Sequence, residues 1–129
     1  MATIRSSITV DRSVDDVWKL IADAGTINEW FPLVEESAML DDNHRTVTLR
    51  GGIRLTEEII TNDADLRRFQ YRIIDGDLPI EHHIGTIDVI EVEGKSLVVY
   101  STDVEPAELA EMVSGAIEGA VTGLAKKLC

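Results

Sequence analysis

The spacing of apolar residues changes along the first part of the chain. Over residues 2–10, apolar and polar positions alternate, which predicts a β-strand. Over residues 14–24 the apolar positions recur at helical spacing, which predicts an amphipathic helix. Ser13 precedes that helix, and Asp16 follows three residues later, as in a capping box. The chain therefore begins with a strand and an amphipathic helix.

A second, short helix is expected directly after the first. Thr26 and Glu29 have capping-box spacing, and Pro32 is a residue at which a helix stops. Between Glu29 and Pro32 lie Trp30 and Phe31, two of the few aromatic residues of the chain. We expect these rings to lie in the core or at the mouth of a pocket.

The middle of the chain has the pattern of a sheet. Short runs with β-type residues are separated by turn residues, and we expect strands at 34–40, 44–50, 53–61, 68–74, 82–92 and 96–104. A three-residue loop at 50–52 pairs Leu49 with Ile53 and gives one consistent apolar face, which a two-residue loop does not. The same register places Arg45 opposite Glu57.

The last predicted element is a long helix that begins near Pro106 and carries one apolar stripe. Gly115, Gly119 and Gly123 run beside the stripe at intervals of four residues. Each glycine costs a helix interior about 1 kcal/mol relative to alanine, so their alignment needs a reason. Either the helix approaches another element closely there, or the glycines leave open volume for a ligand.

The order of these elements predicts an α+β fold. A single antiparallel sheet of seven strands would curve around the long C-terminal helix, and the two short helices after the first strand would plug one end. A cavity is expected between helix and sheet. The length suits one domain spanning residues 1–129.

Composition and charge narrow the possible functions. Twelve basic and 24 acidic residues give a formal charge of −12, which repels phosphate backbones and anionic lipid, so neither nucleic acid nor a membrane surface is an expected partner. No window approaches the roughly 20 apolar residues of a membrane span. The N-terminus lacks an apolar signal core, and the lone Cys129 can form no internal disulfide. We expect a cytoplasmic monomer or homodimer.

Several stretches resemble the START/Bet v 1-like (SRPBCC) superfamily, and in particular its bacterial polyketide cyclase/dehydrase-like branch. They are VDDVWKLI at 14–21, INEWFP at 27–32, EEIITND at 57–63, YRIIDGDLP at 71–79 and the glycine-bearing last helix. The resemblance implies a helix-grip fold. It leaves the function broad, because the superfamily includes lipid carriers, hormone receptors and cyclases.

Polar residues on the concave face of the predicted sheet are the informative ones. Glu57 falls there between apolar neighbours, so its carboxylate needs protonation or a partner such as Arg45 or Tyr71. It is either an acid/base group or a structural carboxylate. His83 faces the same side and is either an acid/base, a ligand anchor or a lining residue. Its neighbour His82 points to the other face, so the two imidazoles do not form a metal site.

The candidate site residues follow from this face and from the elements beside it. Glu57 and His83 are the candidate catalytic residues. The candidate ligand-binding residues are Trp30, Phe31, Leu55, Glu57, Phe69, Tyr71, Leu78, Pro79, His83, Tyr100, Met112 and Ala116. No glycine loop has nucleotide-binding spacing, and neither a metal nor a cofactor is expected.

Three functions remain open from the sequence. The first is a carrier or sensor that encloses a small hydrophobic or aromatic molecule. The second is a polyketide cyclase, aromatase or dehydratase acting in the same cavity. The third is a protein-interaction module with a filled core. A cavity lined only by apolar atoms favours the first, an acid and a base at one point favours the second, and the absence of a cavity above about 300 Å³ favours the third.

Overall fold

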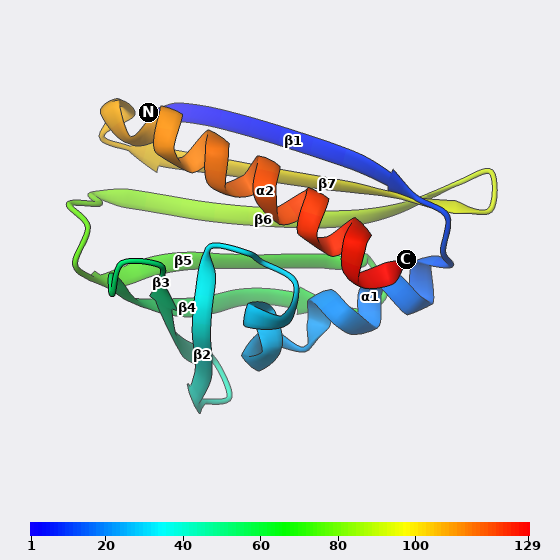
Figure 1. The fold of residues 1–129 in the computed structure, drawn as a ribbon, viewed down its shortest axis with the longest axis horizontal. Coiled ribbons are helices and arrows are strands. Elements are labelled where there is room, and N and C mark those ends of the chain that lie inside the picture. The colour runs from blue at the N-terminus through cyan, green and yellow to red at the C-terminus, as the bar shows by residue number, and fades with distance from the viewer.

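The computed structural model describes residues 1–129 as seven strands and four helical segments (Figure 1). The strands are β1 (Ala2–Val10), β2 (Val34–Asp41), β3 (His44–Leu49), β4 (Arg54–Asp63), β5 (Arg68–Gly76), β6 (His82–Val92) and β7 (Lys95–Glu105). The α-helices are α1 (Val14–Ala22) and α2 (Ala110–Leu128), and the 3₁₀ segments are η1 (Ala24–Glu29) and η2 (Ala107–Leu109). None of these helices is long and apolar enough to span a membrane.

The strands form one antiparallel sheet in the order β1-β7-β6-β5-β4-β3-β2. The sheet curves around α2, which runs diagonally across its concave side, and α1 with η1 lies at one end (Figure 1). This arrangement confirms the predicted α+β helix-grip fold. The strand boundaries differ from the expected ones by no more than two residues, and those of β1 and β6 are the expected ones.

The turn between β3 and β4 has the predicted three-residue register. The Leu49 N–H donates to the Ile53 carbonyl at 2.7 Å, and Arg45 lies opposite Glu57. Both Gly51 and Gly52 have positive φ, at 93° and 83°, which a residue with a side chain rarely adopts. The turn therefore depends on both glycines.

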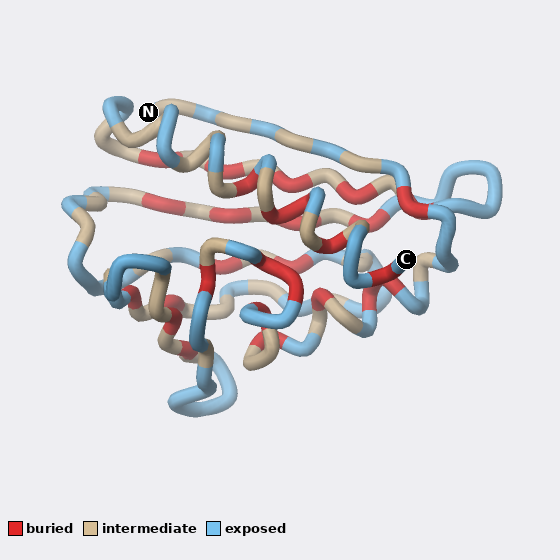
Figure 2. Tube along the Cα trace, viewed as in Figure 1, coloured by how far each residue is buried: buried red, intermediate tan, exposed pale blue.

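Alternation along the strands separates the core from the solvent. In β7 every second residue from Ser96 to Val104 is buried, and the residues between them are half-buried (Figure 2). Ile117, Val121 and Leu124 of α2 pack onto that inner face as part of one hydrophobic core. The period-two pattern of the sequence is thus the pattern of burial.

One expectation about the short helices is wrong. The first helix ends at Ala22, two residues before the expected end, and Ser13 caps it as expected by accepting from the Asp16 N–H at 3.2 Å. Thr26 does not open the second segment but lies inside η1. Its hydroxyl donates to the Asp23 carbonyl at 3.0 Å, so it follows the start of the segment and cannot cap it.

The three glycines of α2 have different environments. A Cβ on Gly123 would lie 2.3 Å from the Trp30 carbonyl oxygen, so this glycine permits close approach of α2 to the segment after η1. A Cβ on Gly115 or Gly119 would meet nothing within 4 Å. Close approach therefore explains one glycine of the three, and the other two border a surface groove between α2 and Pro32.

The sheet opens between β5 and β6 next to the loop that joins them. The last β5–β6 pair is Tyr71 with Gly85, after which β5 continues beside β4 and β6 continues beside β7. The His83 imidazole fills the opening, since the Ile73 N–H donates to its Nδ1 atom at 3.2 Å. A side chain replaces the backbone partner where the ladder ends.

Candidate functional site

A cavity of about 90 Å³ lies between α2 and the concave face of the sheet. Fifteen of its 18 lining residues are hydrophobic, so a ligand there would meet mainly apolar atoms. The lining comprises Ile27, Phe31, Leu33, Val34, Val47, Leu49, Leu55, Glu57, Tyr71, Ile73, Leu78, Ile80, His83, Thr102, Met112, Val113, Ala116 and Ile117.

Most of the candidate ligand-binding residues line this cavity. They are Phe31, Leu55, Glu57, Tyr71, Leu78, His83, Met112 and Ala116. Trp30, Phe69 and Tyr100 are buried in the core outside the lining, and Pro79 is exposed beside the mouth. All three aromatic residues belong to the hydrophobic core.

Thr102 is the lining residue that the candidate set lacks and that matters most chemically. Its place on β7, two residues after Tyr100, puts it on the concave face, so alternation alone identifies its direction. The sequence does not show that the Thr102 hydroxyl lacks a hydrogen-bond partner, because this depends on which groups the fold brings near it. Val113 and Ile117 of α2 were also missed, although they belong to the apolar stripe.

The cavity has a mouth and a buried side. Met112 of α2 is 46% exposed, and Leu78 and Ile80 of the β5–β6 loop are partly exposed. On the sheet side, Glu57, His83 and Thr102 are each buried. The lining therefore connects the surface with the polar residues of the sheet.

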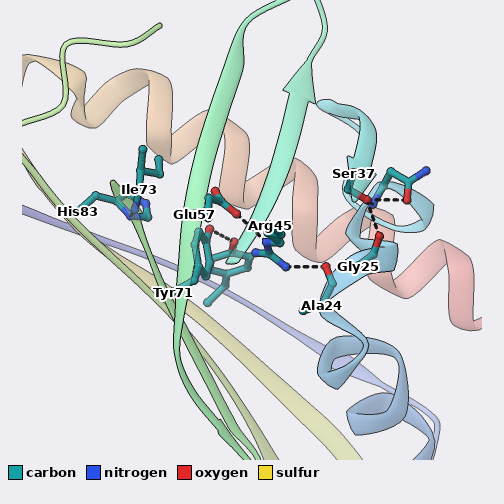
Figure 3. Close-up of polar contacts among 10 residues, drawn as sticks. Ala24, Gly25, Ser37, Arg45, Glu57, Tyr71, Ile73 and His83 are labelled. Atoms are coloured by element: carbon teal, nitrogen blue, oxygen red, sulfur yellow. Dashed lines mark hydrogen bonds and ion pairs between the residues drawn. The ribbon is translucent and has the colours of Figure 1, made fainter. Parts of the chain in front are cut away.

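Glu57 is held by a buried cation. Its Oε1 accepts from Arg45 Nε at 2.7 Å, and the Nη1 group of Arg45 donates to the Ala24 carbonyl at 2.9 Å (Figure 3). The guanidinium, 1% exposed, also lies over the rings of Phe69 and Tyr71, with its Cζ 5.3 and 4.9 Å from the centroids. Glu57 thus has the partner expected from the strand register.

Tyr71 and Tyr100 share a hydrogen bond between their hydroxyl groups. Burial raises the pKa of both phenols, and the nearby Glu57 carboxylate raises them further. Both therefore stay protonated at neutral pH. Of the two, only Tyr71 lines the cavity, and the hydroxyl group of this residue is hydrogen-bonded to Tyr100.

His83 is neutral in the fold. Burial, followed by the neighbouring His82, lowers the pKa of its imidazole to about 4. Because Nδ1 accepts from Ile73, the hydrogen-bond network assigns the proton to Nε2 (Figure 3). The ring therefore presents an N–H donor.

Thr102 brings an unpartnered hydroxyl to the cavity. The residue is 1% exposed, and its Oγ1 atom has no hydrogen-bond partner. A buried hydroxyl in this state costs about 1–3 kcal/mol relative to a paired one. On the sheet side of the cavity, one hydrogen-bonding group therefore lacks a partner within the chain.

The arrangement has no metal-binding geometry, because no group of three or more His, Cys, Asp or Glu side chains is placed to hold an ion. What it offers is an apolar enclosure that has three polar residues, Glu57, His83 and Thr102, and the ring of Tyr71 on the side of the sheet. Its volume of about 90 Å³ is below the lower limit of about 300 Å³ for ordinary ligand pockets. Judged by this volume, the conformation resembles a filled core more than an open ligand pocket.

Comparison with known proteins gives one family match. The model of the family described as "Polyketide cyclase / dehydrase and lipid transport" matches residues 1–128. A search of curated proteins gives no match.

Solved structures share the fold at low sequence identity. The protein XoxI from Bacillus cereus is 23% identical, with 99% of this chain and 96% of that chain covered and a TM-score of 0.90. A START superfamily protein from Mycobacterium smegmatis is 12% identical over 98% and 96% of the two chains, with a TM-score of 0.84. The di-domain ARO/CYC protein BexL of the BE-7585A biosynthetic pathway is 17% identical, with a TM-score of 0.83. The match covers 98% of this chain but 46% of BexL.

Proposed function

The chain belongs to the polyketide cyclase / dehydrase and lipid transport family, and from this premise we propose that it binds a small, largely apolar molecule between α2 and the sheet, as a carrier or sensor. The observation that carries the proposal is the composition of the cavity. An apolar lining leads from partly exposed side chains at the mouth to polar side chains buried on the sheet side. Apolar enclosure supplies affinity, and a few polar groups supply orientation.

The small volume of the cavity is compatible with binding because its mouth is adaptable. Met112 is unbranched and 46% exposed, so it can change rotamer without opening the core. Leu78 belongs to a loop and not to the sheet, and Gly115 and Gly119 leave space beside α2. We infer that the ligand-free cavity is contracted and widens when these side chains move outward.

Native mass spectrometry of the purified protein, compared with its denatured mass, tests this proposal. A retained or added apolar molecule should appear as a mass difference that denaturation removes. In the variant Ala116→Leu, the larger side chain occupies the cavity and should abolish the difference. Thr122→Leu is the matched control, because it enlarges an exposed residue of the same helix outside the cavity.

The outcomes separate binding in the cavity from binding elsewhere. Loss of the added mass in Ala116→Leu but not in Thr122→Leu supports the proposal. Equal retention by both variants would place the molecule outside the cavity. No retained mass, together with no thermal shift across a library of apolar and aromatic compounds, would favour the interaction module with a filled core.

A second candidate function is catalysis of cyclisation, aromatisation or dehydration in the same cavity. The observation in its favour is that the Glu57 carboxylate and the His83 imidazole both line it. Glu57, which Arg45 holds by a hydrogen bond, would be the general base, while the neutral His83 would donate a hydrogen bond to a carbonyl. Chemical change of a bound compound by the native protein, lost in Glu57→Gln with binding retained, would support this function over carriage.

A further inference from the structure

We propose that His83 and Thr102 form a polar anchor that selects ligands with one uncharged oxygen, a carbonyl or a hydroxyl, on an otherwise apolar body. The inference rests on the proposed function, because it concerns the ligand of the same cavity. It goes further by naming the chemical group that the ligand must carry and the two side chains that bind it.

The Thr102 hydroxyl is the first half of the anchor. It lines the cavity, is 1% exposed and has no hydrogen-bond partner in the chain. Buried polar groups are nearly always paired, so an orphan that faces a cavity points to an external partner. The methyl group and the hydroxyl of threonine can respectively pack on and hydrogen-bond a ligand of mixed character.

The His83 imidazole is the second half. The opening of the sheet beyond Tyr71 and Gly85 leaves the Ile73 N–H without a backbone partner, and this group donates to His83 Nδ1 at 3.2 Å. The interaction orients the ring and leaves the proton on Nε2. No acceptor within the chain hydrogen-bonds that N–H, and the residue lines the same cavity as Thr102.

Strand register brings the two groups together. Thr102 pairs with Gly85 across the β6–β7 ladder, and His83 precedes Gly85 by two residues, so both side chains lie on the concave face as diagonal neighbours. The Tyr71 ring covers Gly85, since a Cβ there would lie 2.6 Å from it. An oxygen between the two anchor residues can accept from His83 Nε2, while the Thr102 hydroxyl donates to a carbonyl or pairs with a ligand hydroxyl.

The charges around the cavity exclude an anionic ligand. The Glu57 carboxylate lines the cavity, whereas Arg45 does not: its Nε and Nη1 donate to Glu57 and to the Ala24 carbonyl, and its unpartnered Nη2 is buried outside the lining. A ligand carboxylate would approach Glu57 with no cation in the lining, inside a chain of net charge −12. The oxygen that fits is therefore uncharged.

The test uses four compounds with nearly the same shape: ethylbenzene, 1-phenylethanol, acetophenone and benzoate. Each is titrated into the ¹⁵N-labelled native protein, and dissociation constants are read from amide shifts of the residues that line the cavity. We expect acetophenone and 1-phenylethanol to bind at least about fivefold more tightly than ethylbenzene, as one or two hydrogen bonds would give. Benzoate should bind most weakly.

The variant Thr102→Val keeps the shape of the residue and removes the hydroxyl. It should reduce the preference for the oxygenated compounds over ethylbenzene by about fivefold and leave ethylbenzene binding unchanged. Thr86→Val is the matched control, since Thr86 lies on β6 outside the cavity. His83→Asn, which retains an acceptor for Ile73 but loses the Nε2 donor, provides a second variant should Thr102→Val fail to fold.

Each outcome decides a different point. Equal binding of ethylbenzene and acetophenone to cavity residues, unaffected by either anchor variant, would overturn the anchor and leave the proposed function standing. Tighter binding of benzoate would overturn the selection against charge. No shift of cavity residues with any of the four compounds would contradict the proposed function and the anchor together.

Discussion

Buried polar side chains on the concave face differ in how far their hydrogen bonds are satisfied. Arg45 pairs with Glu57 and keeps one unpartnered nitrogen, Nη2, and Tyr71 pairs with Tyr100. The Thr102 hydroxyl has no partner. The two pairs stabilise the fold without a ligand, whereas the unpaired hydroxyl leaves a cost that only an added partner or a substitution can remove.

Replacing Thr102 by valine should stabilise the ligand-free protein. The substitution keeps the β-branched shape and removes a buried hydroxyl that has no partner, so we expect a gain of about 1–2 kcal/mol in the free energy of unfolding. Urea denaturation measures it. Thr86→Val, which removes the acceptor of the Gln70 amide, should instead cost about 0.5–1 kcal/mol. A loss in Thr102→Val as large as in the control would show that the hydroxyl has a partner.

His83 makes part of the stability dependent on pH. The pKa of its imidazole is about 4 in the fold, below the ordinary value of 6.5 for an exposed imidazole, so the unfolded chain binds the proton more readily. The stabilisation is present above pH 6.5 and is lost as the pH falls to 4, to an extent of about 3 kcal/mol.

The variant His83→Asn isolates this contribution. Asparagine does not titrate and can still accept from the Ile73 N–H. Unfolding free energies of the two proteins, measured from pH 7 to pH 4, should fall more steeply for the native protein. Parallel curves would mean that His83 binds its proton equally well in both states.

At the scale of elements, the sequence predicts what local periodicity determines. Alternation locates every strand, and the side chains around Gly51 and Gly52 choose the register of the β3–β4 turn. Helix ends are predicted less well, because a capping motif such as that of Thr26 and Glu29 competes with tertiary contacts. Here Ser37 of β2 donates to the Gly25 carbonyl at 2.8 Å and ties that carbonyl to the sheet (Figure 3).

The glycines of α2 give a matched pair of substitutions on one helix. Gly119→Ala should stabilise the protein by about 1 kcal/mol, because a Cβ there meets nothing within 4 Å and alanine favours the helix. Gly123→Ala should destabilise it by more than that amount, because the Cβ would lie 2.3 Å from the Trp30 carbonyl. Thermal unfolding measures both, and effects of the same sign would contradict the assigned environments.

The Arg45–Glu57 pair joins three elements, since Arg45 reaches from β3 to Glu57 on β4 and to Ala24, the first residue of η1. Arg45→Met leaves a buried carboxylate without a counter-ion and should cost about 3–5 kcal/mol. The double variant with Glu57→Gln should recover part of that loss. Chemical denaturation of the single and double variants gives the coupling, and strictly additive costs would argue against the pair.

At the scale of the whole molecule, the site is predicted less completely than the fold. Periodicity identifies residues that face inward, and Glu57, Tyr71 and His83, which it places on the concave face, all line the cavity. It does not distinguish inward residues that pack together, such as Phe69 and Tyr100, from those that border empty space. The cavity is a small difference between the volume enclosed by the sheet and the volume of the side chains within it, and only the folded backbone determines that difference.

The net charge of −12 should make stability depend on salt. At low ionic strength the excess carboxylates repel one another over distances comparable to the molecule, and this repulsion is screened near physiological salt. Thermal unfolding should therefore shift upward by a few degrees between about 0.01 M and 0.15 M sodium chloride, equivalent to about 1 kcal/mol. A downward shift would mean that screening of the surface ion pairs outweighs screening of the repulsion.

The pairing of the first strand with the last one has a consequence for the newly made chain. Ala2 of β1 pairs with Val104 of β7, so β1 leaves the ribosome long before its only partner strand exists. During that interval an apolar strand would be an aggregation hazard. Every second position of β1 is polar and exposed, at Thr3, Arg5, Ser7 and Thr9. We expect this alternation to limit aggregation of β1 during the interval before β7 is synthesised.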